Sequence, residues 1–81
     1  MEQIQEYRSH DFYLSAIVLA AGLQLIRLER GAGKFVDFVF SDPEKKAEQI
    51  IANHWNKTLR IPTRSVIEAV NELKTRLYSG V

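Results

Sequence analysis

The sequence predicts a small α+β domain in which an antiparallel β-hairpin packs against three helices. Apolar residues recur at helical spacing in three segments, and two other segments alternate apolar and polar residues around a glycine-containing turn. The composition, with 46% hydrophobic and 26% charged residues, is that of a globular domain. The expected order of elements is α-β-β-α-(β)-α. The expected divisions of the chain are an N-terminal tail at 1–10, one domain at 11–79 and a C-terminal end at 80–81.

The first helix is predicted over 11–21. Asp11 suits the N-cap position, and Gly22 suits the position that follows the last turn. The helix is apolar around most of its circumference, and its main stripe consists of Leu14, Ile17, Val18 and Ala21. A helix of this kind must be covered on more than one side, either by helices of the same chain or by a second subunit.

The hairpin is predicted from two strands, 23–30 and 34–40, around a turn at 31–33. Symmetric pairing about this turn places Ile26 opposite Phe38 and Leu28 opposite Val36. These residues are expected to face the core with Phe40. The same pairing sets Arg27 opposite Asp37 on the other face, as an oppositely charged cross-strand pair. Three apolar residues share that outer face and are expected to form an interaction surface: Leu25, Phe35 and Val39.

Two further helices follow the hairpin. The segment Ser41-Asp42-Pro43-Glu44 predicts the start of the second helix, with Asp42 as the cap and Pro43 as the first helical residue. Its apolar stripe consists of Ala47, Ile50, Ile51, His54 and Trp55. The third helix is expected to begin with Thr63 or Ser65 as its cap, and Ser65 and Glu68 have the spacing of a capping box.

Between these helices, 59–61 has the character of a short extended segment before Pro62. If it pairs with the strand at 34–40, the helix between them makes a right-handed crossover and the sheet gains a third strand.

The residue types present argue against an enzyme. The chain contains no cysteine, which excludes a disulfide framework, a thiolate zinc site and a cysteine nucleophile. The two histidines, His10 and His54, have no spacing that implies a shared metal, and no catalytic constellation is apparent. The run Gly31-Ala32-Gly33-Lys34 is interpreted as a hairpin turn and not as a phosphate loop, because it leads into a strand. We therefore expect no catalytic residue, no metal and no cofactor.

The sequence also predicts a cytoplasmic protein that does not enter a membrane. Its longest apolar run, 17–23, is far shorter than the roughly 20 residues that span a bilayer.

The charges are unevenly distributed along a chain whose formal net charge is +1. Residues 49–67 contain Lys57, Arg60 and Arg64 and no acidic residue. Basic residues beside an aromatic ring suit a nucleic-acid backbone with a stacked base, and Trp55 or Phe35 would supply the ring. The alternative interpretation is a solvated loop and a helix start beside a core tryptophan.

Phe35-Val36-Asp37-Phe38, followed by the segment that begins Ser41-Asp42-Pro43-Glu44, resembles the third strand and second helix of RNA-recognition-motif domains. This resemblance implies that Phe35 stacks on a base at the open face of a sheet. Gly33 stands where that family has its other aromatic residue.

A second resemblance extends over 11–74 and rests on three motifs together with Gly22 and Leu73-Lys74. The motifs are Asp11-Phe12-Tyr13-Leu14-Ser15-Ala16, Phe38-Val39-Phe40-Ser41-Asp42-Pro43 and Leu59-Arg60-Ile61-Pro62-Thr63-Arg64. They resemble the D-x-Y-L-A-A, F-x-F-x-D-P and L-x-V-P-x-R motifs of a family of small bacterial and phage domains of unknown function. The resemblance implies a fold and a bacterial or mobile-element setting, and it brings no known substrate or site residue.

Two functions remain open from the sequence. The first is a small non-catalytic binding module that associates weakly and salt-dependently with nucleic acid through Lys57, Arg60 and Arg64. The alternative is a module that binds a protein partner, or forms a homodimer, without a nucleic-acid role.

Overall fold

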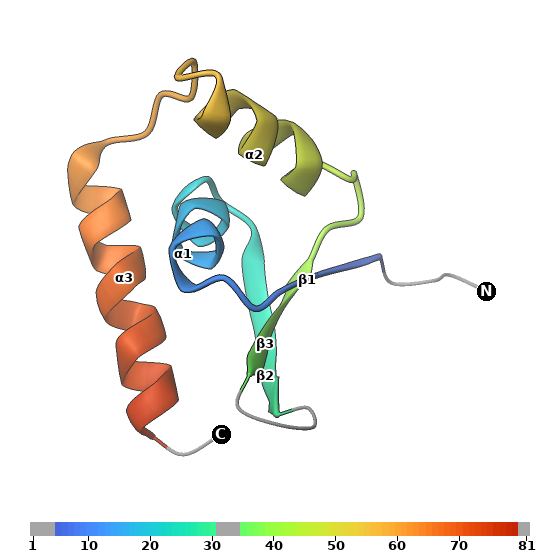
Figure 1. Ribbon diagram of the computed structural model, residues 1–81, viewed down its shortest axis with the longest axis vertical. Coiled ribbons are helices and arrows are strands. Elements are labelled where there is room, and N and C mark those ends of the chain that lie inside the picture. The colour runs from blue at the N-terminus through green and yellow to red at the C-terminus, as the bar shows by residue number, and fades with distance from the viewer. Residues whose placement is uncertain (1–4, 31–34, 80–81) are drawn as a thin grey trace.

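The protein is described by a computed structural model that covers residues 5–30 and 35–79. It is an α+β domain in which a three-stranded antiparallel sheet packs against helices, as the sequence predicts (Figure 1). The helix α1 lies against one face of the sheet and is flanked by α2 and α3. The elements, in chain order, are β1 (Glu6–Ser9), α1 (Phe12–Ala20), β2 (Gln24–Arg30), β3 (Val36–Ser41), α2 (Ala47–Trp55) and α3 (Thr63–Tyr78).

The third strand of the sheet comes from the N-terminal segment and not from 59–61. The strand order is β1-β3-β2, so β3 is central and β1 lies within the expected tail, 1–10. Tyr7 of β1 pairs with Phe40 of β3, and their ring centroids are 6.4 Å apart. The backbone N–H of Leu59 instead donates to the carbonyl of Asn53, which ties the start of 59–61 to the end of α2.

The hairpin register differs from symmetric pairing by two residues. Leu28 pairs with Phe38, and Arg27 pairs with Val39. A shift of two keeps the inward residues of each strand on the same face, because side chains alternate with a period of two. The expected pairs of Ile26 with Phe38, of Leu28 with Val36 and of Arg27 with Asp37 are wrong. The turn at 31–33 lies outside the described residues.

A β-bulge between Leu25 and Arg27 explains the two misplaced apolar residues of β2. The bulge inserts one extra residue, so Leu25 turns inward to pair with Phe40, and Ile26 is left 37% exposed. Leu25 joins the core and is not part of an outer apolar surface. The core consists of Ala16, Val18, Leu25, Phe38, Phe40, Ala69 and Leu73.

The start of α1 matches the prediction, because the Asp11 carboxylate accepts a hydrogen bond from the Leu14 N–H at 2.9 Å. Gly22 follows the helix with φ of +114°, a conformation that glycine adopts without strain. The helix α2 begins at Ala47, later than predicted. The buried carboxylate of Asp42 nevertheless accepts the N–H groups of Lys46 and Ala47, at 2.7 and 3.0 Å.

The start of α3 differs from the prediction. Pro62 occupies its N-cap position, so neither Thr63 nor Ser65 caps the helix. The expected capping box between Ser65 and Glu68 does not form, and Glu68 instead pairs with Arg64 at 3.3 Å.

Candidate functional site

The outer face of the sheet carries a network of ion pairs. Arg8 and Arg27 both bind the Glu29 carboxylate, and these hydrogen bonds lower the pKa of Glu29. Arg27 also binds Glu6 at 3.1 Å, and Arg8 lies 3.8 Å from Asp37. The hydrogen bonds to these carboxylates raise the pKa of both arginines. The charges of this network are thus paired with one another across the outer face.

This network covers the apolar residue at the centre of the face. Val39 pairs with Arg8 on one side and Arg27 on the other, and it is fully buried. Long arginine stems bury apolar surface in this way while their guanidinium groups stay in water. Val39 is therefore unavailable as the interaction residue that the sequence predicted.

Phe35 is separated from the other predicted site residues. It is 65% exposed, directly precedes β3, and its ring lies 5.1 Å from that of His10. The hairpin end of β2 and β3 and the connection between α2 and α3 lie at opposite ends of the molecule (Figure 1). The structure therefore does not bring Phe35 together with the basic residues of that connection.

The basic residues lie on the surface around the α2–α3 connection. Lys57 follows α2 with φ of +63°, Arg60 lies in the connection, and Arg64 is in the first turn of α3. All three are exposed. Arg64 pairs with Glu68, whereas no ion pair among the described residues involves Lys57 or Arg60.

Trp55 stands beside this segment and is exposed. Its side chain is 67% exposed, and its ring lies 5.1 Å from the His54 ring. The interpretation of Trp55 as a core residue is therefore wrong: it is the last residue of α2, and most of its side chain is exposed.

A groove lies where the three helices meet. We call it the helical groove, and its volume is about 300 Å³. The helix α1 contributes Ile17, and the loop between α2 and α3 contributes Leu59 and Ile61. The full lining is Ile17, His54, Lys57, Leu59, Ile61 and Val66.

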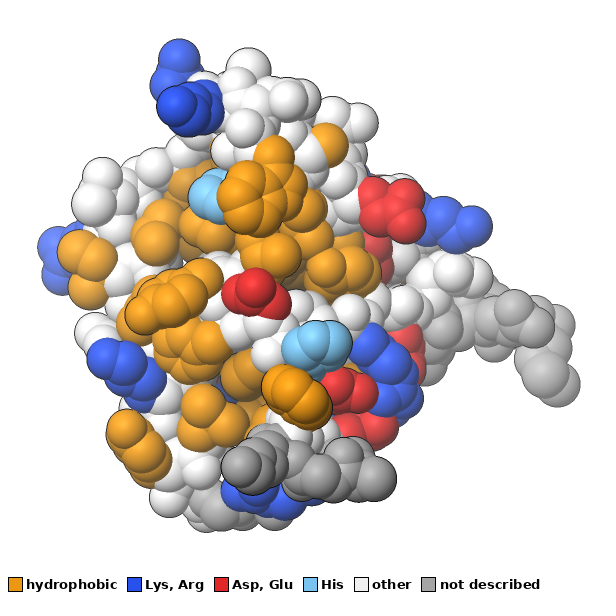
Figure 2. All heavy atoms as spheres, in the orientation of Figure 1, with side chains coloured by type: hydrophobic (Ala, Val, Ile, Leu, Met, Phe, Trp, Pro, Cys, Tyr) orange, Lys and Arg blue, Asp and Glu red, His pale blue; other side chains and the backbone are white. Residues whose placement is uncertain are grey.

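Two exposed aromatic residues neighbour lining residues of the helical groove. Tyr13 is 73% exposed and lies one turn before Ile17 on the same face of α1. Trp55 is 67% exposed and directly follows His54. Figure 2 shows apolar side chains over this face of the molecule, with an acidic side chain among them and lysine and arginine side chains toward its margin. The signal in the sequence was an all-round apolar first helix, but its neighbours could not be identified from spacing alone.

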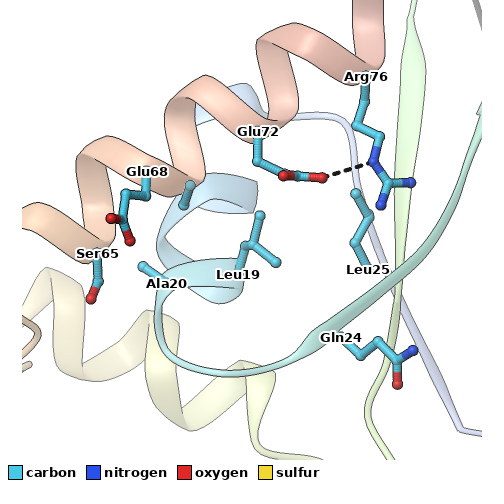
Figure 3. Close-up of a pocket in the computed structure, with 9 residues that line it drawn as sticks. Leu19, Ala20, Gln24, Leu25, Ser65, Glu68, Glu72 and Arg76 are labelled. Carbon is cyan, nitrogen blue, oxygen red and sulfur yellow. Dashed lines mark hydrogen bonds and ion pairs between the residues drawn. The ribbon is translucent and has the colours of Figure 1, made fainter. Parts of the chain in front are cut away.

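A larger cavity of about 520 Å³ lies between α1, α3 and the start of β2 (Figure 3). Leu19, Leu25 and Ala69 give it an apolar base. Its charged groups are engaged with one another or with neighbours: Glu72 binds Arg76 at 2.9 Å, and Glu68 binds Arg64 outside the cavity. These carboxylates already have cationic partners, so the cavity gives no indication of a particular ligand.

Within residues 5–30 and 35–79, no group of three or more histidine or acidic side chains is arranged to hold a metal. None of the helices in the same ranges has the length and hydropathy needed to cross a membrane. Comparison with protein-family models, with curated proteins and with solved structures finds no match to this chain.

Proposed function

We propose that this protein is a non-catalytic protein-binding module whose docking surface is the helical groove together with Tyr13 and Trp55. The observation that carries the proposal is the pair of largely exposed aromatic rings, each next to a lining residue of an apolar groove: Tyr13 one turn before Ile17, and Trp55 directly after His54. Aromatic side chains in contact with a pocket are the residues that contribute most to binding energy at protein interfaces.

The volume and lining of the groove favour an apolar side chain of a partner as its occupant. At about 300 Å³ it is at the lower end of the range for small-molecule sites, roughly 300–1,000 Å³. Its lining is mainly aliphatic, with Ile17, Leu59, Ile61 and Val66. Such a surface gains free energy by removing apolar area from water, at about 25 cal/mol per Å².

Selection from a random peptide library tests this proposal. Phage that display random dodecapeptides are panned on immobilised wild-type protein and on the double variant Tyr13→Ser/Trp55→Ser. We expect wild-type protein to enrich peptides that the double variant does not retain. The matched control is Phe35→Ser, which removes a similarly exposed ring outside the lining of the groove and should enrich the same peptides. Equal enrichment on the double variant, or no enrichment on wild-type protein, would overturn the proposal.

Nucleic-acid binding is the second candidate, and the exposure of Trp55 beside Lys57 and Arg60 favours it. An exposed indole next to basic residues can stack on an unpaired base while the cations contact phosphates. Contacts to about three phosphates predict a log–log salt slope near −2, at roughly −0.7 per phosphate of a single strand.

Fluorescence anisotropy with a labelled oligothymidine at low salt checks this second candidate. The charge reversal Arg60→Glu/Arg64→Glu should abolish binding without unfolding the domain, because both side chains are exposed. Phe35→Ala should leave binding unchanged, since Phe35 lies at the opposite end of the domain. If the affinity for the oligonucleotide is the same in the charge-reversed variant and in wild-type protein, nucleic-acid binding through these residues is excluded.

A further inference from the structure

We infer that the partner segment of the helical groove is acidic and inserts one large apolar side chain between α1, α2 and α3. This inference rests on the proposed function, because it specifies what the same groove binds. It follows from the charges around the groove, from its aliphatic lining and from the number of apolar groups that its volume admits.

The charged residue in the lining of the groove is basic, and two further basic residues follow it in the chain. Lys57 belongs to the lining itself, and Arg60 and Arg64 follow it in the same connection and the start of α3. No acidic residue occurs between Gln49 and Ile67. The residues of α1 are uncharged, and the carboxylate of its N-cap, Asp11, is bound to the Leu14 N–H.

Two of these cations have no anionic partner among the described residues. The ion pairs of the described chain include Arg64 with Glu68 but none of Lys57 or Arg60. By contrast, the charges on the outer sheet face are mutually paired. Complementary charge steers a partner to the unpaired group, so carboxylates on the partner fit this rim.

The lining of the groove indicates which kind of partner side chain enters it. Ile17, Leu59 and Val66 come from three different parts of the chain and present aliphatic carbon to one small space. A nucleobase needs hydrogen-bond donors and acceptors around its edge, and this lining supplies few. A leucine, methionine or phenylalanine side chain needs none, and a space of about 300 Å³ admits such a group.

A second copy of this chain fits the groove less well than an acidic partner. Two-fold pairing through the groove places the same patch of both copies in contact. Lys57, Arg60 and Arg64 of one copy would then approach those of the other, and like charges brought together at an interface oppose binding.

The test compares the peptides that different forms of the protein select. Random dodecapeptide phage are panned at low salt on wild-type protein and on Lys57→Glu/Arg60→Glu. The matched control is Arg30→Glu/Lys45→Glu, which changes the net charge equally at exposed positions outside the groove. Circular dichroism first confirms that every variant is folded.

Wild-type protein and the control should enrich acidic peptides with one leucine, methionine or phenylalanine. The variant with Lys57 and Arg60 reversed should not retain them. In fluorescence anisotropy, this charge reversal should lower the affinity for the best peptide by about tenfold. Added salt should lower the affinity of wild-type protein for the same peptide.

Two kinds of failure are distinguishable. If the enriched peptides depend on Tyr13 and Trp55 but are neutral or basic, the protein-binding function stands and the acidic partner is overturned. If no peptide depends on Tyr13 and Trp55, the proposed function itself fails.

Two further outcomes would assign the groove to another occupant. Displacement of the best peptide by oligothymidine at equal concentration would overturn the inference in favour of nucleic acid. Dimerisation that blocks peptide binding would overturn it in favour of a second copy.

Discussion

At the scale of single residues, Asp42 connects the sheet to the second helix. Its backbone N–H donates to the Gln5 carbonyl beside β1, while its carboxylate accepts two N–H groups at the start of α2. The side chain is buried, and α2 has no cap from the residue at its own N-cap position, Lys46. Asp42 therefore replaces a local cap from four residues before the helix.

We predict that Asp42→Ala lowers the free energy of unfolding by about 1–2 kcal/mol, the upper part of the range for lost caps. The partly buried N–H of Lys46 and the buried N–H of Ala47 would lose their acceptor. Urea denaturation followed by circular dichroism measures the change. The neighbouring exposed Glu44→Ala serves as the control and should change stability by less than about 0.5 kcal/mol. Equal values for both variants would contradict this role.

Phe40 of β3 and Phe35, which directly precedes that strand, differ in what they contribute to stability. We predict that Phe40→Ala lowers the free energy of unfolding by about 3–5 kcal/mol, because Phe40 is fully buried in the core. Phe35→Ala should cost less than about 0.5 kcal/mol, because its ring is 65% exposed. Denaturation of the two variants side by side checks the contrast. If Phe35→Ala lowers the free energy of unfolding as much as Phe40→Ala does, the contact of Phe35 with His10 contributes more to stability than its exposure suggests.

At the scale of elements, the outer sheet face makes stability depend on pH. The arginines lower the pKa of Glu29 in the folded state relative to the unfolded chain. A lowered pKa contributes stability above the unfolded value, and this contribution is lost as the pH falls through the folded value. The contribution should therefore be complete above about pH 5 and decline below the ordinary glutamate pKa of about 4.3.

We predict that Glu29→Gln lowers stability at neutral pH and reduces the acid-dependent loss. Urea denaturation midpoints, measured from neutral to acidic pH, give the pH dependence of stability for the variant and for wild-type protein. Glu68→Gln is the matched control, since Glu68 forms a single exposed pair with Arg64. The prediction would be contradicted if Glu29→Gln and wild-type protein lost stability in parallel below pH 5.

Local signals in the sequence predicted the helices better than the sheet. The cap at Asp11 and the glycine at 22 mark both ends of α1, because each acts within one turn of the helix. The pairs from Arg30 with Val36 to Arg27 with Val39 are shifted by two residues from symmetric pairing, and a bulge at Ile26 changes the register again at Leu25. No residue type at these positions indicates either shift. The strand β1 was missed because its four residues form a strand only when β3 is beside them.

The basic part of the candidate site could be predicted, and the groove could not. Lys57, Arg60 and Arg64 are exposed, as expected from an acid-free segment. The groove joins Ile17 to Val66, which are far apart in the chain, so their proximity depends on the packing of α1 against α3. Trp55 was assigned to the apolar stripe of α2, but it is the last residue of that helix and is largely exposed.

At the scale of the whole molecule, the two faces differ in the state of their charges. The outer sheet face has paired charges over a buried Val39, whereas the helical face has exposed rings and cations. The sheet and the two flanking helices cover much of α1, and the residues around Tyr13 and Ile17 border the helical groove. The apolar circumference of α1 thus serves the core on one side and the proposed docking surface on the other.

The most direct test of this account is to map a bound peptide on the protein. Wild-type protein labelled with nitrogen-15 is titrated with the best selected peptide, and the shifts of its backbone amide signals are followed by NMR. We predict that the largest shifts fall on the groove residues Ile17, His54, Lys57, Leu59, Ile61 and Val66. Shifts centred instead on the outer sheet face, or on Phe35 and His10, would contradict the assignment of the helical groove as the docking surface.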